Sequence, residues 1–147
     1  MNSRRHFIKK ATVVASGITM LPAYTVSGLG YRAPNDKMNI VGVGIGGKGF
    51  ANLKAMETEN IIGLCDVDWK YAKSTFQKFP NAKKYYDWRK MFDEMDQDID
   101  AVVVGTPDHT HAIISIHAMK RGKHVYCEKP LTHSVWESRQ MTEVARQ

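Results

Sequence analysis

The chain has 147 residues, of which 43% are hydrophobic and 24% are charged, a composition that suits a protein with one folded core. Five of the 21 Lys and Arg residues and none of the 15 acidic residues lie in residues 1–33, which leaves 16 basic against 15 acidic residues in the remainder. The net charge of +6 therefore comes almost entirely from one end, and a nucleic-acid-binding surface is not expected. Two cysteines, Cys65 and Cys127, are too few for a disulfide scaffold.

The first segment, residues 1–33, has the features of an export signal. The stretch SRRHFIKK, residues 3–10, carries the paired arginines of a twin-arginine signal, and residues 11–31 carry no charge. Ser, Thr, Gly and Pro occur throughout this uncharged stretch, which makes it too polar for a stable membrane span. We expect recognition by the twin-arginine export machinery, a periplasmic or otherwise exported location, and a folded domain over residues 34–147.

A strand, a glycine-rich turn and a helix are predicted over residues 38–56. MNIVGV is an apolar run of strand type, and FANLKAM is amphipathic with helical spacing. Between them, GIGGKG has the spacing of a dinucleotide-binding turn, in which glycines permit a tight turn, close approach of the pyrophosphate and close packing of the helix. A second register that starts at Gly42 also exists, but the later one leaves a full strand before the first glycine. The predicted cofactor-binding residues here are Gly44, Ile45, Gly46, Gly47, Lys48 and Gly49.

The second predicted strand, IIGLC at residues 61–65, ends in an acid. Asp66 follows Gly44 by 22 residues, the place where a carboxylate can accept hydrogen bonds from the ribose hydroxyls of adenosine. A carboxylate there repels a 2′-phosphate, so NAD is favoured over NADP. Lys70 is a candidate for weakening that preference.

The remaining sequence continues to alternate between helix and strand patterns. Ser134 and Glu137 have the spacing of a capping box, and Gly122 is expected to end a helix. The alternation predicts an α/β fold, a doubly wound (Rossmann) parallel sheet with helices on both faces, whose ligand lies outside the carboxyl ends of the strands. Cys65 and Cys127 then fall on strands too far apart for a disulfide. Helices are predicted at 67–79, 88–95, 109–121 and 134–147, and strands at 83–87, 99–106 and 124–127.

Together, the glycine turn and the stretches GLCDVD, DAVVVGTPDHTH and GKHVYCEKPL resemble the Gfo/Idh/MocA oxidoreductase family over residues 37–147. The resemblance implies an NAD-binding domain in which Lys129 of the Glu-Lys-Pro motif is the catalytic lysine, placed to orient a substrate hydroxyl and relay its proton. It implies that Glu128 lies against the cofactor. It also implies that Pro130 fixes the backbone so that Lys129 points inward, with a cis Lys–Pro bond as one means.

Further cofactor-binding positions follow from the same resemblance. Thr106 and Pro107 match positions that line the nicotinamide ribose, and His111 matches a recurring histidine. Asp108 stands where the family often has Asn, and because a carboxylate cannot donate a hydrogen bond it either contacts the cofactor as an acceptor or caps the following helix. His109 and His111 lie two residues apart and therefore on different helix faces, so no metal site is predicted.

The resemblance leaves three functions open. The first is an exported NAD-dependent oxidoreductase acting on a hydroxyl of a sugar, polyol or glycoside. The second is an enzyme that cleaves or epimerises glycosides with no net redox change, and the third is a non-catalytic sensor of nucleotide or sugar. Lys129 favours the first two, because a sensor need not retain it. The family carries a second, α+β substrate domain that we expect to be absent here, so this chain is interpreted as a truncated N-terminal part, inactive alone; a homo-oligomer stays open.

Overall fold

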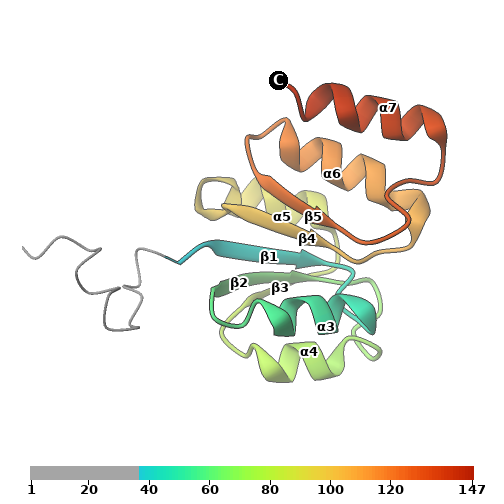
Figure 1. The fold of residues 1–147 in the computed structure, drawn as a ribbon. Coiled ribbons are helices and arrows are strands. Elements are labelled where there is room, and N and C mark those ends of the chain that lie inside the picture. Colours follow the sequence, from blue (N-terminus) through green and yellow to red (C-terminus); the bar gives the residue numbers. More distant parts are fainter. Residues whose placement is uncertain (1–36) are drawn as a thin grey trace, which may run out of the picture. The chain divides into compact units, whose positions relative to one another are not determined.

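Parallel strands alternate with helices throughout residues 37–147, the part of the chain that the computed structural model describes (Figure 1). Residues 1–36, which include the predicted export signal, lie outside the described residues. The strands are β1 Asn39–Val43, β2 Asn60–Cys65, β3 Lys83–Tyr85, β4 Ala101–Val104 and β5 His124–Cys127. The helices are α3 Lys48–Ala55, α4 Lys73–Lys78, α5 Trp88–Met95, α6 His111–Met119 and α7 Val135–Val144, with short 3-10 turns η2 Asp96–Asp98 and η3 Asp108–Thr110.

The sheet has the strand order β3-β2-β1-β4-β5, and every neighbouring pair is parallel. The chain runs outward from β1 to β3 and then returns to β4 on the other side of β1. Helices α3 and α4 consequently cover one face of the sheet, whereas α5 and α6 cover the other, with α7 beside α6 (Figure 1). The predicted doubly wound Rossmann sheet is confirmed. Its switch point lies between β1 and β4, the place where such sheets bind ligands.

Each face of the sheet has its own apolar core, because successive strand side chains point to opposite faces. Val41 of β1 packs with Phe92 of α5 in one core, and Ile40 packs with Leu53 of α3 in the other. A fully buried side chain of this size contributes roughly 1.5–3 kcal/mol relative to exposure. The two cores therefore hold β1 and β4 firmly at the point where the site begins.

Three predicted helices begin at residues other than those expected. The helix predicted at 67–79 is reduced to α4, because Asp68 Oδ1 accepts hydrogen bonds from the backbone of Lys70 at 3.0 Å and of Tyr71 at 2.9 Å and so forms a turn. Helix α3 begins at Lys48, inside the glycine motif and earlier than predicted. The helix predicted at 109–121 starts as η3 and becomes α-helical at His111.

Other local predictions are confirmed. Ser134 Oγ accepts from Glu137 N at 3.3 Å and Glu137 Oε2 accepts from Ser134 N at 2.8 Å, which is the predicted capping box. Cys65 and Cys127 are both free thiols. Among the helices described here, none is long and apolar enough to cross a membrane.

Candidate cofactor site

The glycine turn joins β1 to α3 at the switch point. Gly44 has a φ of 73°, a left-handed conformation that other residues adopt at a cost, and its N–H donates to Cys65 O at 2.9 Å. A Cβ on Gly49 would collide with the carbonyl oxygen of Gly44. Gly42 lies inside β1, so the register that starts at Gly44 is the one the structure has.

Asp66 ties the glycine turn to the end of β2. Its Oδ2 accepts from Ile45 N at 2.9 Å and from Gly46 N at 3.2 Å, and its Oδ1 accepts from Asp68 N at 2.9 Å. A carboxylate has about four lone-pair sites. Three are used within the chain, which leaves room for one further donor such as a ribose hydroxyl. The contact of Asp66 with a ribose stays a prediction, whereas its role in shaping the turn was not predicted.

Ile45 contributes only its backbone to the site. Its side chain is fully buried in the core beneath α3. Its carbonyl oxygen accepts a hydrogen bond of 2.6 Å from the hydroxyl of Thr75, which is itself fully buried in α4. Thr75 therefore braces the turn from 30 residues away, and no local sequence pattern could have identified it.

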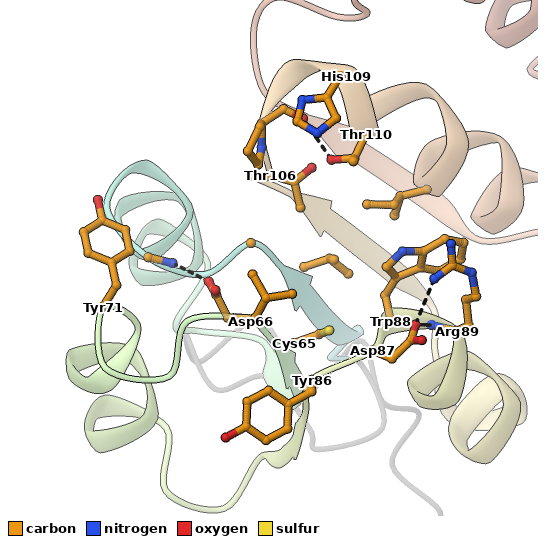
Figure 2. A pocket seen from close by; sticks show the side chains of 17 residues that line it. Cys65, Asp66, Tyr71, Tyr86, Asp87, Trp88, Arg89, Thr106, His109 and Thr110 are labelled. Carbon is orange, nitrogen blue, oxygen red and sulfur yellow. Dashed lines mark hydrogen bonds and ion pairs between the residues drawn. The ribbon is translucent and has the colours of Figure 1, made fainter.

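A cavity of about 670 Å³ opens beside the glycine turn, between the carboxyl ends of β1, β2 and β4 and the start of α5 (Figure 2). This volume lies within the usual range for a small-molecule site. Figure 2 shows Asp66 and Tyr71 at one side of the cavity and Trp88 with Arg89 at the other. Thr106 and His109 border it above. The cavity thus borders both Asp66, predicted to bind the adenosine ribose, and Thr106, predicted to line the nicotinamide ribose.

Aromatic side chains form two walls of this cavity. The Tyr71 ring lies against Gly46 and Gly47, where any Cβ would meet it, although the residue as a whole is 65% exposed. On the opposite wall the Arg89 guanidinium lies 4.6 Å from the centre of the Trp88 ring. Trp88 borders the cavity and also packs against the core, where its ring contacts Phe92 and His117 edge to face. The DWR stretch at residues 87–89 is the sequence signal for this wall of the cavity.

Cys65 also lines the cavity, at the end of β2. Burial raises the pKa of its thiol to about 12, and the charges of Asp66 and Asp87 act in the same direction. A thiol of this kind stays protonated at neutral pH. Cys65 therefore serves as a small apolar surface rather than as a nucleophile.

The loop after β4 carries Thr106, Pro107 and Asp108. Thr106 and Pro107 line the cavity, and the buried Thr106 hydroxyl has no hydrogen-bond partner among the described residues. Asp108 accepts from His109 N at 3.0 Å and lies 3.7 Å from His133 Nδ1. Asp108 does not cap α6, whose N-cap residue is Thr110.

His111 is 1% exposed and joins two loops. Its Nε2 lies 2.6 Å from Thr106 O and its Nδ1 lies 2.8 Å from Pro130 O. Both ring nitrogens face backbone carbonyls, so the side chain connects the loop after β4 to the loop after β5. A direct contact between His111 and the cofactor stays a prediction.

Glu128 and Lys129 follow β5, and the Lys129–Pro130 peptide bond is cis, as the Glu-Lys-Pro motif suggested. Glu128 is 8% exposed, and its Oε1 accepts from Asn52 Nδ2 at 2.8 Å. This hydrogen bond is the main reason that the pKa of Glu128 lies below its ordinary value. Lys129 is exposed, and its backbone N–H donates to Glu128 Oε2 at 3.2 Å.

Eight of the thirteen predicted site residues fall into two groups. Gly44, Gly46, Asp66, Thr106 and Pro107 line the cavity. A second group of residues, Lys48, Glu128 and Lys129, lies beyond the glycine turn, where Lys48 Nζ is 3.9 Å from Glu128 Oε1. A dinucleotide fits this layout, because the cavity lies at the switch point of the sheet and the unpartnered Thr106 hydroxyl can bond a ligand.

Comparison with known proteins agrees with this geometry. Residues 37–147 match the family described as "Oxidoreductase family, NAD-binding Rossmann fold", Gfo/Idh/MocA. Among solved structures, the WlbA dehydrogenase from Chromobacterium violaceum, in complex with NADH and UDP-GlcNAcA, superposes with a TM-score of 0.67 and 25% identity over 75% of this chain and 32% of that one. The NAD-binding protein from Listeria innocua gives 0.65 and 29% over the same shares.

Curated relatives carry two kinds of name. The alpha-N-acetylgalactosaminidase of Shewanella oneidensis is 29% identical over 97% of this chain and 36% of its own length. The levoglucosan dehydrogenase of Pseudarthrobacter phenanthrenivorans is 35% identical over 56% of this chain and 21% of its own. This chain therefore spans about a third or less of the relatives that it matches. From fold, glycine turn and family match together, the chain belongs to the Gfo/Idh/MocA oxidoreductase family, as its NAD-binding Rossmann domain.

Proposed function

We propose that this chain is the cofactor-binding part of an NAD-dependent oxidoreductase that acts on a hydroxyl of a sugar, polyol or glycoside. The observation that carries the proposal is the placement of Glu128 and Lys129 at the end of β5, tied by Asn52 to the helix that follows the glycine turn. Lys129 follows Glu128, which is bonded to the helix after the glycine turn, and its side chain remains exposed and accessible to a substrate. The names of the WlbA and levoglucosan dehydrogenases support a carbohydrate substrate.

The roles of the residues follow from their positions. Asp66 binds a ribose hydroxyl of the adenosine, and the N-terminus of α3 faces the pyrophosphate with its free N–H groups. Thr106 donates its hydroxyl to the nicotinamide half. When bound, NAD supplies the acceptor for a hydride from the substrate carbon. Lys129 orients the hydroxyl on that carbon and relays its proton toward solvent as the carbonyl forms.

A direct test measures NAD binding and turnover separately. We expect this chain to bind NAD in calorimetric titration, and we expect the whole protein to reduce NAD with a member of a panel of sugars, polyols and glycosides. If the whole protein binds NAD but neither reduces it nor converts any sugar, polyol or glycoside of the panel, the non-catalytic sensor is favoured over both enzymes.

Cleavage of a glycoside with no net redox change is the second candidate. It is favoured by the names of relatives that align with 97% of this chain, an alpha-N-acetylgalactosaminidase and glycosyl hydrolase family 109 proteins. In such a reaction the hydride is returned to the substrate, so Lys129 keeps the same role. Release of a sugar from a glycoside without accumulation of NADH would identify this candidate, and stoichiometric NADH would exclude it.

Export through the twin-arginine route is part of the same proposal and rests on the SRRHFIKK stretch. That route carries folded proteins, and free NAD is scarce outside the cytoplasm. A cofactor loaded before export and retained through many turnovers resolves this conflict. We expect the exported whole protein to release nicotinamide nucleotide when denatured. A protein that emerges empty and needs millimolar NAD would contradict retention.

A further inference from the structure

The carboxylate of Glu128 is held by a side chain 76 residues earlier in the sequence. Asn52 Nδ2 donates to Glu128 Oε1 at 2.8 Å, and both side chains are buried, at 7% and 8% exposure. Tyr126 OH donates to the same oxygen at the longer distance of 3.4 Å. Asn52 provides the shorter bond and is buried, whereas Tyr126 is 46% exposed. Asn52 therefore has the stronger influence on where this carboxylate lies.

The second carboxylate oxygen of Glu128 contacts the backbone of Lys129. Glu128 Oε2 accepts from the backbone N–H of Lys129 at 3.2 Å. A continuous set of contacts thus runs from Asn52 through the carboxylate to the backbone that carries Lys129. Displacement of the carboxylate would release that backbone N–H and alter the direction in which the lysine leaves the strand.

Asn52 also belongs to the helix that begins at the glycine turn. Lys48 is the first residue of α3, and Asn52 lies four residues later, about one helical turn, on the same side of the helix. Lys48 Nζ lies 3.9 Å from Glu128 Oε1, but the Lys48 side chain is 67% exposed, so this pair adds little. The helix whose N-terminus faces the pyrophosphate is thereby linked to the reacting end of the site mainly through Asn52.

We propose that Asn52 is a positioning residue that couples the glycine-turn helix to Glu128 and so orients Lys129 for reaction. The proposal rests on the proposed function for the role of Lys129, but the coupling itself concerns only residues of this chain. A purely structural Asn52 would affect folding alone. A positioning Asn52 affects the titration of Glu128 and the turnover number while leaving cofactor affinity in place.

The first experiment uses this chain and needs no substrate. The carboxyl carbon of Glu128 is followed by NMR through an acid titration in the wild type, in Asn52→Leu and in Asn60→Leu. Asn60→Leu is the matched control, since it removes a 3.1 Å side-chain hydrogen bond to Asn39 at the opposite end of the sheet. We expect the titration midpoint of Glu128 to rise in Asn52→Leu only, with a shift of the Lys129 amide signal. An unchanged midpoint would overturn the proposal.

The second experiment uses the whole protein. Asn52→Leu is expected to lower kcat about tenfold, as for loss of one charge-assisted hydrogen bond, with the Kd for NAD changed by less than about twofold. Asn52→Asp keeps the size of the side chain and replaces the amide donor by a carboxyl group. This variant replaces Asn52→Leu in the experiment if the leucine variant does not fold. Its kcat should recover as the pH falls and the two carboxyl groups share a proton.

These results separate two kinds of failure. If Lys129→Ala lowers kcat but both Asn52 variants keep the wild-type kcat and pH profile, Asn52 is not a positioning residue and the proposed function stands. If Lys129→Ala itself leaves kcat unchanged, the proposed function fails whatever the Asn52 variants do. A loss of NAD affinity that matches the loss of kcat would assign Asn52 to the stability of the glycine turn and overturn the positioning role.

Discussion

The glycine turn and the Glu128–Lys129 turn both follow short strands, but they are stabilised by different kinds of contact. The glycine turn is shaped mainly by the backbone conformation of its own glycines, and Asp66 and the Thr75 hydroxyl brace it through its backbone groups. The Glu128–Lys129 turn is held by side chains of Asn52 and His111, which come from two other helices. The first turn therefore tolerates few changes in its own residues, whereas the second depends on residues that are distant in sequence.

The largest effect is expected for Lys129→Ala. If Lys129 relays the substrate proton, this change should lower the turnover of the whole protein by roughly 10²–10⁴, the range for loss of an acid–base group. The Kd for NAD should stay near the wild-type value, because Lys129 lies outside the cavity. Lys120→Ala, an exposed change just after α6, is the control and should be neutral. Wild-type turnover in Lys129→Ala would mean that the Glu-Lys-Pro motif has only a structural role.

Gly49→Ala tests the glycine turn itself. The added Cβ would collide with the Gly44 carbonyl oxygen, so α3 must move away from the turn. Overpacking of this kind costs about 1–3 kcal/mol, and we expect both a lower free energy of unfolding and at least about tenfold weaker NAD binding. Urea denaturation and calorimetry measure the two. The control is Ala51→Ser, on the exposed side of α3, which should change neither the free energy of unfolding nor the affinity for NAD. Normal NAD affinity in Gly49→Ala would show that the turn is less constrained than its geometry indicates.

Replacement of Asp66 separates its two roles. Asp66→Ala removes both the acceptor for the turn amides and the charge that repels a 2′-phosphate, so NAD should bind about tenfold more weakly and the preference over NADP should narrow. Asp66→Asn keeps an acceptor oxygen for the turn and should lose less affinity for NAD. Parallel titrations with NAD and NADP check both variants. Tighter binding of NADP by the wild type would contradict the assignment of Asp66.

The smallest effect concerns pH. The hydrogen bond from Asn52 lowers the pKa of Glu128. The ionised Glu128 therefore stabilises the fold above the ordinary glutamate pKa, and this stabilisation is lost as the pH falls through the lower pKa of the folded state. The stability lost in Glu128→Gln should therefore be greatest near neutral pH and should shrink below about pH 4. Acid denaturation followed by circular dichroism measures it. A stability difference that is independent of pH would exclude an ionised, hydrogen-bonded Glu128.

Glu57 provides the comparison for that experiment. A hydrogen bond and ion pair with Lys78 on the surface, at 2.6 Å, lower the pKa of Glu57 as well. Both partners are more than 40% exposed, so salt should screen their attraction. At high ionic strength the loss of stability caused by Glu57→Gln should become small. The loss caused by Glu128→Gln should persist, because the hydrogen bond between Asn52 and Glu128 is buried. Equal sensitivity to salt would mean that the Glu128 turn is held no more tightly than a surface pair.

Sequence reasoning was most successful where a function depends on neighbouring residues. The glycine spacing, the acid after β2 and the capping box at Ser134 each involve residues that are close in the chain or in adjacent strands, and the structure has all three in place. The helix predicted at 67–79 was wrong over its first half, because Asp68 competes for backbone N–H groups and forms a turn that periodicity does not reveal. The export signal stays a prediction.

By itself, the sequence determined the alternation of strands and helices, the glycine turn and the order in which the site residues enter the fold, since these depend on local conformation and periodicity. Only the tertiary structure decided which side chains meet across the sheet: Thr75 under Ile45, Tyr71 over the glycine turn and Asn52 against Glu128. Such pairs are set by how helices pack on the sheet, and packing joins residues regardless of their separation in the chain. Asn52 follows the glycine motif by three residues, yet its partner became apparent only when β5 was placed beside β4.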